Sequence, residues 1–321
     1  MTVIDCERPR VAVVGAGGVG GLLAAMLARA GHDVRVLARG AALEAITRRG
    51  VVVRGPGGEH TVAVAQVADA AAALGPVDLV LVTVKTWQLA ELGPRLAPLI
   101  GPRTLVIPLQ NGVEASEVLG AALGDDHVLG AVCRVISWIE RPGEVRWMGL
   151  PLALTIGARR PTQGDAIEAC AATLRSAGIE VIVSDAIDRA RWLKFLFIAA
   201  YSAVGAVARV PLGTLRADPA ARARLDAVMH EVVAIAGARG VALPPETVAL
   251  TMQRLDSLPA DATASMHRDI VAGRPSELHE LIGAVVRLGR ETGVATPVSA
   301  ALYAELEPLE RLARARCSVL G

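Results

Sequence analysis

The sequence predicts an α/β fold in two parts. An N-terminal domain with a doubly wound parallel sheet is expected over residues 1–184, and an all-helical C-terminal domain over residues 185–321. Two observations lead to this prediction. A β-branched run at residues 11–14 ends in a glycine-rich turn and a helical stretch, and strand-like runs then alternate with helical ones. After Asp185 no convincing strand pattern remains.

The composition is typical of a globular protein that does not bind nucleic acid. The chain has 321 residues, of which 53% are hydrophobic, so it can bury roughly three quarters of its unfolded surface, enough for two domains. A net charge of +1 and only 2% aromatic residues provide no basic face for a phosphate backbone, so we expect no nucleic-acid partner.

Cysteine spacing and apolar runs indicate a reduced, cytoplasmic protein. The four cysteines show no C-x-x-C spacing, so we expect neither a metal site nor a disulfide framework. The longest apolar run, Phe195–Val207, is shorter than the roughly 20 residues that a membrane span needs. It is typical of a core helix, and we expect no membrane partner.

The glycine-rich turn has the G-x-G-x-x-G spacing of a dinucleotide-binding loop. In such loops the first glycine makes the tight turn, the second lets backbone approach the pyrophosphate, and the third lets the helix pack on the strand. A second strand at residues 34–39 supplies the βαβ context that the motif needs. We therefore expect a Rossmann-type domain whose cofactor contacts include Gly15, Gly17, Gly18, Val19 and Gly20.

The end of the second predicted strand indicates which cofactor binds. NAD enzymes usually carry Asp or Glu there for the ribose 2′-hydroxyl, whereas this chain has Arg39. A guanidinium suits a 2′-phosphate, which favours NADPH. The alternative is an arginine that is merely solvated on a loop.

Three polar side chains follow the next two predicted strands. Residues 78–84 run into Lys85 and Gln88, and residues 105–108 lead to Asn111. Because the carboxyl ends of parallel strands meet at the ligand crevice, we expect these side chains to lie there. Further strands are expected at 128–139 and 143–148, joined by a hairpin turn, and at 180–184 after a helix at 166–177.

Lys85 and Lys194 are the only lysines among 33 basic residues, and Asn111 is the only asparagine. Lysine differs from arginine in that burial can make it lose its proton. A helix from about Ile187 carries Lys194, Ile198 and Ser202 on one stripe, which we expect to face the cofactor crevice. The plainer alternative is two lysines left at solvated or packing positions.

A later segment supplies two more candidates. A helix at 263–272 bears Ser265, and Glu277 is expected to start the next helix, where the macrodipole favours a carboxylate. His267 and His279 have no partners at metal-ligand spacing and are interpreted as ordinary surface or core residues.

Taken in order, these motifs resemble the ketopantoate reductase (2-dehydropantoate 2-reductase) family. They are the glycine loop, Arg39, V-K-T-W-Q at 84–88, Q-N-G at 110–112, W-L-K-F at 192–195, and Ser265 followed by R-P-S-E at 274–277. The resemblance implies an enzyme of pantothenate biosynthesis that delivers hydride from NADPH to a small 2-oxo acid in the cleft between two domains. Whether the helical domain forms a homodimer stays open.

The resemblance also implies roles for single residues. Lys194 matches the general acid and Glu277 the carboxylate that contacts the substrate. Ser265 matches a ligand of the substrate carboxylate, Asn111 a residue bridging substrate and cofactor, and Lys85 with Gln88 a cofactor contact.

The chain departs from the family pattern at three positions. Members usually carry two asparagines one and two turns after the lysine, where this chain has Ile198 and Ser202, and His279 replaces an aspartate. These side chains help hold the hydroxyl end of the substrate, so Ser202 is expected to contact it, while Ile198 makes the pocket apolar. A reductase of a different 2-oxo acid, carbonyl or imine is the alternative. A non-catalytic NADP-binding protein is disfavoured, because it has no need for Lys194 with Glu277.

Overall fold

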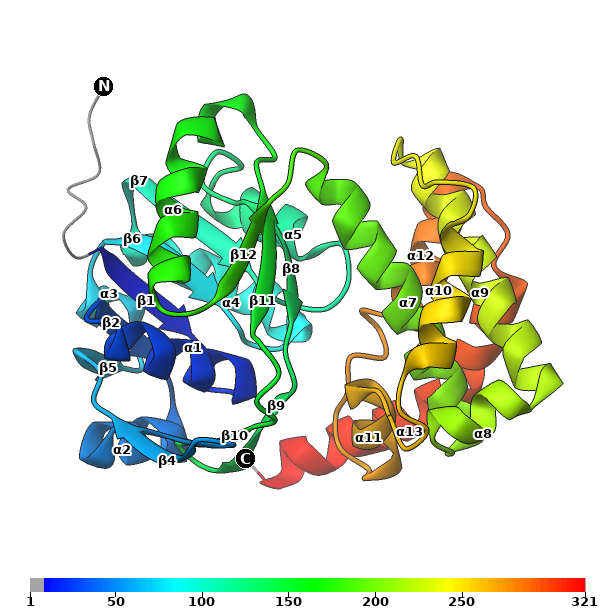
Figure 1. The fold of residues 1–321 in the computed structure, drawn as a ribbon, viewed down its shortest axis with the longest axis horizontal. Helices are drawn as coiled ribbons and strands as arrows, with labels where there is room; N and C mark the ends of the chain where they lie inside the picture. Colours follow the sequence, from blue (N-terminus) through cyan, green and yellow to red (C-terminus); the bar gives the residue numbers. More distant parts are fainter. Residues whose placement is uncertain (1–8, 321) are drawn as a thin grey trace. The chain divides into compact units, whose positions relative to one another are not determined.

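The computed structural model describes residues 9–320, and the side chains of residues 9–316. It folds into two compact units (Figure 1). The first holds the chain up to Gln110 and Glu114–Ile187, and the second holds Asn111–Val113 and the chain from Asp188 onwards. All described strands lie in the first unit, and the second is helical. The predicted α/β domain followed by a helical domain is therefore confirmed.

The first unit is built on a five-stranded parallel sheet with the strand order β5-β2-β1-β6-β7. The central strand β1 (Arg10–Val14) pairs with β2 (Asp33–Leu37) on one side and β6 (Val77–Val82) on the other. The edges are β5 (Gln66–Ala68) and β7 (Ile100–Pro108). The strand order reverses between β1 and β6, at the kind of switch point where such sheets bind ligands.

Alternate residues of β1 face opposite hydrophobic layers. Val11 and Val13 pack with helices α1 and α6, whereas Ala12 and Val14 pack with α3 and α5. Helices thus cover both faces of the sheet (Figure 1), which is the predicted doubly wound arrangement. The helices of this unit are α1 (Gly18–Arg29), α2 (Gly40–Arg49), α3 (Ala71–Leu74), α4 (Leu89–Leu92), α5 (Ala115–Leu123) and α6 (Gly164–Ser176), with 3-10 turns η1 (Thr86–Gln88), η2 (Gly93–Leu99) and η3 (Pro161–Gln163).

Two smaller sheets complete the first unit, with the orders β4-β3-β10-β9 and β12-β11-β8. The strand expected at 128–139 is split between them. The hairpin expected around Gly143 is present, with the glycine at φ 74°. The strands of these sheets are β3 (Val51–Gly55), β4 (Gly58–Val62), β8 (Gly130–Arg134), β9 (Ser137–Arg141), β10 (Glu144–Trp147), β11 (Ala153–Gly157) and β12 (Glu180–Val183).

The second unit packs its helices around one apolar core. Helix α7 contributes much of this core. By length and composition α7 is the one helix of the described chain that could cross a membrane, yet 67% of its most apolar window is buried in the protein. The helices are α7 (Ile187–Ala208), α8 (Leu212–Ala217), α9 (Pro219–Ala238), α10 (Thr247–Ser257), α11 (Ser265–Val271), α12 (Ile282–Thr292) and α13 (Pro297–Leu320).

The expectation that Glu277 starts a helix is wrong. Helix α12 begins only at Ile282, and Glu277 lies in a bend that leads into a turn. The Glu277 carbonyl accepts one bond from the Leu281 amide, at 3.0 Å. The amide of the preceding Ser276 is bound by a distant carboxylate, that of Glu310. The helical pattern is not continued, because the Gly283 amide bonds to Leu278, five residues earlier, and the Leu281 backbone is not helical (φ −106°, ψ −93°).

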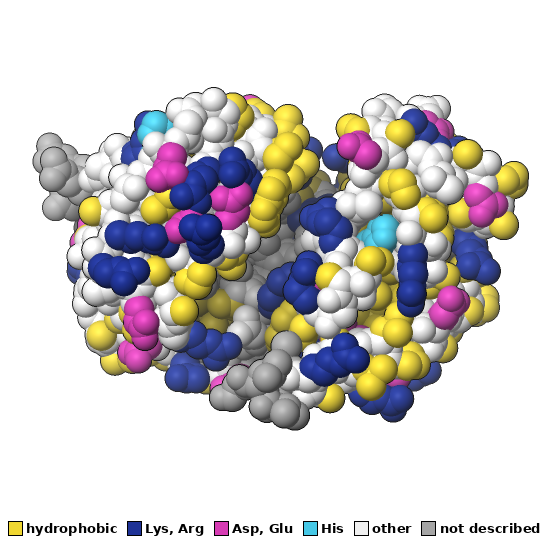
Figure 2. Space-filling model, turned by 90° about the horizontal axis from the view of Figure 1, so that it is seen from below, with side chains coloured by type: hydrophobic (Ala, Val, Ile, Leu, Met, Phe, Trp, Pro, Cys, Tyr) yellow, Lys and Arg dark blue, Asp and Glu magenta, His cyan; other side chains and the backbone are white. Residues whose placement is uncertain are grey.

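On the face seen in Figure 2, basic and acidic side chains are interspersed. In the first unit Arg54 contacts Glu59, Glu140 and Glu144, and Arg146 pairs with Glu140. Such interleaving is in keeping with the net charge of +1.

Candidate functional site

The glycine loop connects β1 to α1 with the geometry that the motif predicts. Gly15 has φ 100°, and its amide donates to the Leu37 carbonyl at 2.9 Å. A Cβ at Gly20 would lie 1.9 Å from the Gly15 oxygen, so only glycine lets α1 pack this closely. At Gly17, by contrast, a Cβ would meet nothing within 4 Å. The loop is thus tight where helix meets strand and open at the glycine that a pyrophosphate would approach.

The first turn of α1 suits an anionic ligand. The helix starts at Gly18 and carries no acidic residue in its first turn, so its free amides and positive dipole end are not neutralised. A Cβ at Gly18 would lie 2.7 Å from the Trp138 Cα, which shows that β9 packs against the start of the helix. Val19 follows, half-buried, in the same turn. These residues fit a dinucleotide.

Arg39 occupies the N-cap position of α2, directly beyond the end of β2. Its side chain is exposed and forms no ion pair with any residue of the described chain. The first turn of α2 has no acidic residue. The guanidinium is therefore available to an anion at the carboxyl edge of the sheet.

The loop after β6 is held by local contacts. The Lys85 amide donates to the Gln88 Oε1 at 3.1 Å, and the Lys85 Nζ lies 5.7 Å from the centre of the Trp87 ring, within the range of a cation–π contact. Buried Gln110 donates from Nε2 to two carbonyl oxygens at the end of β6, both at 2.9 Å. Its Oε1 is buried, and no residue in the described part of the chain bonds to it. Gln110 thus joins the ends of β6 and β7.

Asn111 and Glu277, 166 residues apart in sequence, meet directly. The Asn111 Nδ2 donates to the Glu277 Oε2 at 3.0 Å, and Glu277 is only 5% exposed. Buried Arg191 of α7 donates to the Val113 carbonyl and pairs with Asp188 at 2.7 Å. These bonds hold the Asn111–Val113 segment in the helical unit. Two predicted site residues are therefore brought together.

The predicted stripe on α7 divides into two parts. Lys194 and Ile198 are half-buried, whereas Ser202 is fully buried, and its hydroxyl donates to the Ile198 carbonyl one turn earlier. Its donor is therefore used within the helix, and Ser202 could contact a substrate only by accepting a hydrogen bond at its buried oxygen. Ser265, the first residue of α11, is half-buried.

His279 is paired within the helical unit. Its Nδ1 lies 2.8 Å from the Tyr303 hydroxyl of α13, and burial lowers the pKa of His279, which favours the neutral imidazole. His267 is buried, and burial lowers its pKa too. Across the described side chains, no group of three His, Cys, Asp or Glu residues could hold a metal ion.

Two carboxylates near Glu277 were not predicted as site residues. Burial raises the pKa of Glu280 to about 7, and its buried Oε2 has no hydrogen-bond partner among the described residues. Glu310 of α13 is 1% exposed and binds Ser276, the neighbour of Glu277. No local pattern marks either residue, because both environments are created by packing between distant segments.

The Glu280→Gln variant is expected to gain stability relative to the parent as pH rises. The folded protein disfavours the ionised carboxylate, so this cost is absent below pH 4.5 and grows until the pH passes about 7. The difference in Tm between variant and parent should therefore be more positive near pH 8 than near pH 4, by at least about 2 °C. Thermal unfolding at both pH values checks this. An equal difference at both would mean that the Glu280 pKa is not raised.

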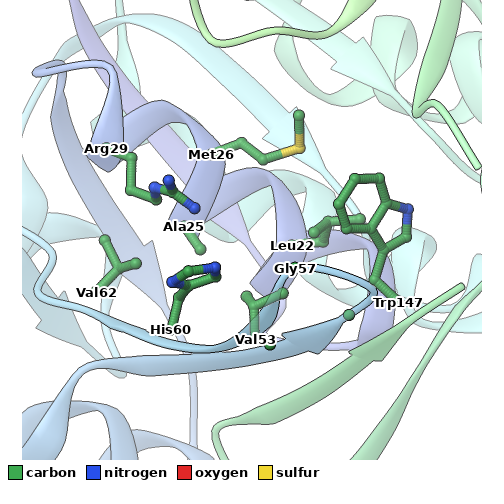
Figure 3. Close-up of a pocket in the computed structure, with 11 residues that line it drawn as sticks. Leu22, Ala25, Met26, Arg29, Val53, Gly57, His60, Val62 and Trp147 are labelled. Atoms are coloured by element: carbon green, nitrogen blue, oxygen red, sulfur yellow. The ribbon is translucent and has the colours of Figure 1, made fainter. Parts of the chain in front are cut away.

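A separate hollow of about 250 Å³ lies between α1 and the β3–β4 hairpin. Arg29, His60 and Val62 line one end and Trp147 the other (Figure 3). None of the predicted site residues lines it, so it is not the candidate active site.

Family models cover both units of the chain. Residues 11–161 match the model described as ketopantoate reductase PanE/ApbA, and residues 186–310 match that of its C-terminal region. The chain belongs to the ketopantoate reductase family. The resemblance seen in the sequence is thereby confirmed, and it places the chain among pyridine-nucleotide-dependent oxidoreductases.

Individual relatives of this ketopantoate reductase family member align over nearly their full length. A 2-dehydropantoate 2-reductase of Caulobacter vibrioides is 32% identical, over 92% of this chain and 97% of the relative. An uncharacterized oxidoreductase of Bacillus subtilis is 28% identical, over 93% and 98%. The crystal structure of a PanE/ApbA family ketopantoate reductase from Ralstonia eutropha has a TM-score of 0.86 and 32% identity, covering 95% of this chain and 99% of that one.

Proposed function

We propose that the chain is an NADPH-dependent reductase that converts a 2-oxo acid to a 2-hydroxy acid, with Lys194 as general acid. The observation that carries this proposal is the hydrogen bond between Asn111 and Glu277. Two residues with predicted roles at the substrate meet in the unit that also holds Lys194 on α7. A non-catalytic nucleotide-binding protein has no need of this pairing.

The first unit supplies the residues that would hold the cofactor. The open side of the loop at Gly17 and the amides of α1 suit the pyrophosphate, and Arg39 suits the 2′-phosphate. Lys85 and Gln88 are further proposed contacts at the same sheet edge. When bound, NADPH supplies the hydride that the carbonyl carbon of the substrate accepts.

Lys194 would stabilise the negative charge that forms on the substrate oxygen. Reduction of a ketone places negative charge on its oxygen, so an ammonium hydrogen-bonded there stabilises the transition state and then gives up a proton. Arginine could provide the charge but not the proton. This difference explains a lysine at position 194 in a chain that otherwise prefers arginine.

Asn111, Glu277 and Ser265 would position the substrate. The Asn111 amide donates a hydrogen bond to one oxygen of the buried Glu277 carboxylate, and this bond restrains the orientation of the carboxylate. We assign Glu277 to the substrate itself, Ser265 to its carboxylate, and Asn111 to both substrate and cofactor.

A panel of 2-oxo acids that includes ketopantoate tests the proposal. Purified protein should oxidise NADPH in the presence of at least one 2-oxo acid and release the matching 2-hydroxy acid. NADPH binding without turnover on any member of the panel would instead support the non-catalytic alternative.

The substrate is proposed to differ from ketopantoate at its hydroxyl end. Ile198 offers no hydrogen bond, Ser202 is fully buried and gives its hydroxyl hydrogen to the Ile198 carbonyl, and the Nδ1 atom of His279 is bound to Tyr303. A buried hydroxyl left unpaired costs about 1–3 kcal/mol. A 2-oxo acid with an apolar side chain should therefore have the higher kcat/KM.

Replacing Ile198 by asparagine should shift this preference. We expect Ile198→Asn to move the ratio of kcat/KM values toward ketopantoate by roughly tenfold or more, since the amide can pair with the hydroxyl. Ile198→Val, which stays apolar, is the matched control. If the parent enzyme clearly prefers ketopantoate to its 4-deoxy analogue, the apolar-pocket interpretation is wrong.

A further inference from the structure

Glu310 and Arg314, on successive turns of α13, form hydrogen bonds with Ser276. The Glu310 carboxylate accepts from the Ser276 amide at 3.1 and 3.0 Å and from its hydroxyl at 2.5 Å. Arg314 donates to Glu310 at 2.6 Å and to the Ser276 carbonyl at 3.1 Å. The amide, hydroxyl and carbonyl of one residue are thus all bound by one ion pair, which we call the α13 clamp.

The α13 clamp acts next to Glu277. Because Glu277 lies in a bend outside any helix, no helical hydrogen bonds fix the chain that leads into it. On one side the backbone is held through Ser276, and on the other by the turn to Leu281. Glu310 itself is buried, at 1% exposed. We therefore expect the position of the Glu277 carboxylate to depend on the hydrogen bonds between Glu310 and Ser276.

We propose that Glu310 is a positioning residue that holds Glu277 against Asn111 for the reaction. This inference rests on the proposed function of Glu277. Glu310 accepts hydrogen bonds from Ser276, the residue before Glu277, and from Arg314, so we expect it to act on the substrate through Glu277.

The same unit contains a matched control. Buried Glu231 of α9 accepts from the Val298 amide at 2.8 Å, from the Ser299 amide at 3.0 Å and from the Ser299 hydroxyl. Glu231 thus binds a serine in the way that Glu310 does, but at the start of α13. Replacing either glutamate by glutamine removes one of two acceptor oxygens and the charge, but only Glu310 is bonded to the residue next to Glu277.

Steady-state kinetics of the two variants test the role. We expect both Glu310→Gln and Glu231→Gln to lower Tm, because a buried carboxylate that accepts several bonds is lost in each. Glu310→Gln alone should lower kcat/KM for the 2-oxo acid, by roughly 10- to 100-fold, as misplacement of a substrate contact does. NADPH affinity should stay unchanged in both. Equal activity of the two variants would overturn the proposal.

A double-mutant cycle separates positioning from general destabilisation. If Glu310 acts through Glu277, adding Glu310→Gln to Glu277→Gln should cause no further loss of kcat/KM. A further loss of the full size would overturn the positioning role. Should Glu310→Gln fail to fold, Ser276→Ala removes the hydroxyl contact and Ser276→Thr retains it. The first is then expected to reproduce the loss and the second to stay near the parent, and equal activity would contradict the proposal.

A crystal structure of Glu310→Gln, or of Ser276→Ala in its place, tests the inference without catalysis. Glu277 should be displaced from Asn111, and an unmoved segment from Ser276 to Leu281 would overturn the positioning role. If the parent protein reduces no 2-oxo acid while this displacement is seen, the proposed function fails and the structural dependence stands. If the parent protein is active and the segment does not move in the variant, the proposed function stands and the positioning role of Glu310 fails.

Discussion

Replacing Lys194 by alanine is expected to lower kcat by about 10²–10⁴ with little change in NADPH affinity. The loss combines two effects, because the ammonium stabilises the developing oxyanion and also delivers its proton. Lys194→Arg should be almost as damaging, since a guanidinium keeps its proton. Single-turnover kinetics of both variants with saturating NADPH measure this step.

The arginine variant is the sharper of the two tests. Near-normal turnover by Lys194→Arg would show that positive charge alone suffices and that the proton comes from another group. Loss of NADPH binding in Lys194→Ala would place the lysine at the cofactor instead.

The Arg39→Ala variant should bind NADPH roughly 10- to 150-fold more weakly and NADH almost as before. A charge-assisted hydrogen bond contributes about 1.5–3 kcal/mol, and only NADPH has the 2′-phosphate that would accept it. Fluorescence titration of both cofactors measures the change. Arg48→Ala, which removes another exposed arginine from the far end of α2, is the control and should alter neither affinity.

Equal weakening of NADPH and NADH by Arg39→Ala would contradict the assignment to the 2′-phosphate. A parent protein that binds NADH as tightly as NADPH would do the same.

The parts of the fold that local patterns specify were predictable from the sequence. The β-branched run before the glycine loop and the apolar run of α7 each signal their element through composition and spacing, and both are present. The hairpin of β3 and β4 is not signalled in this way. Most of β4 is exposed, so its side chains carry no apolar alternation, and its place is set by pairing with β3.

The candidate site likewise combines features that local patterns indicate with features that only the fold creates. Motifs indicated Asn111 and Glu277 separately, and the fold joins them. Periodicity placed Ser202 on the Lys194 stripe but could not show that its hydroxyl bonds back to the helix, a choice open to any helical serine. The binding of Ser276 by Glu310, 34 residues later, has no local signal at all.

The most direct test of the central claim follows deuterium from the cofactor into the product. NADPH deuterated at both C4 positions of its nicotinamide is incubated with the parent protein and the best 2-oxo acid of the panel, and the product is analysed by mass spectrometry. We expect one deuterium on C2 of a 2-hydroxy acid for each NADPH oxidised, and a rate that falls with Lys194→Ala. Oxidation of NADPH without deuterium at C2, or no oxidation with any 2-oxo acid, would contradict the account.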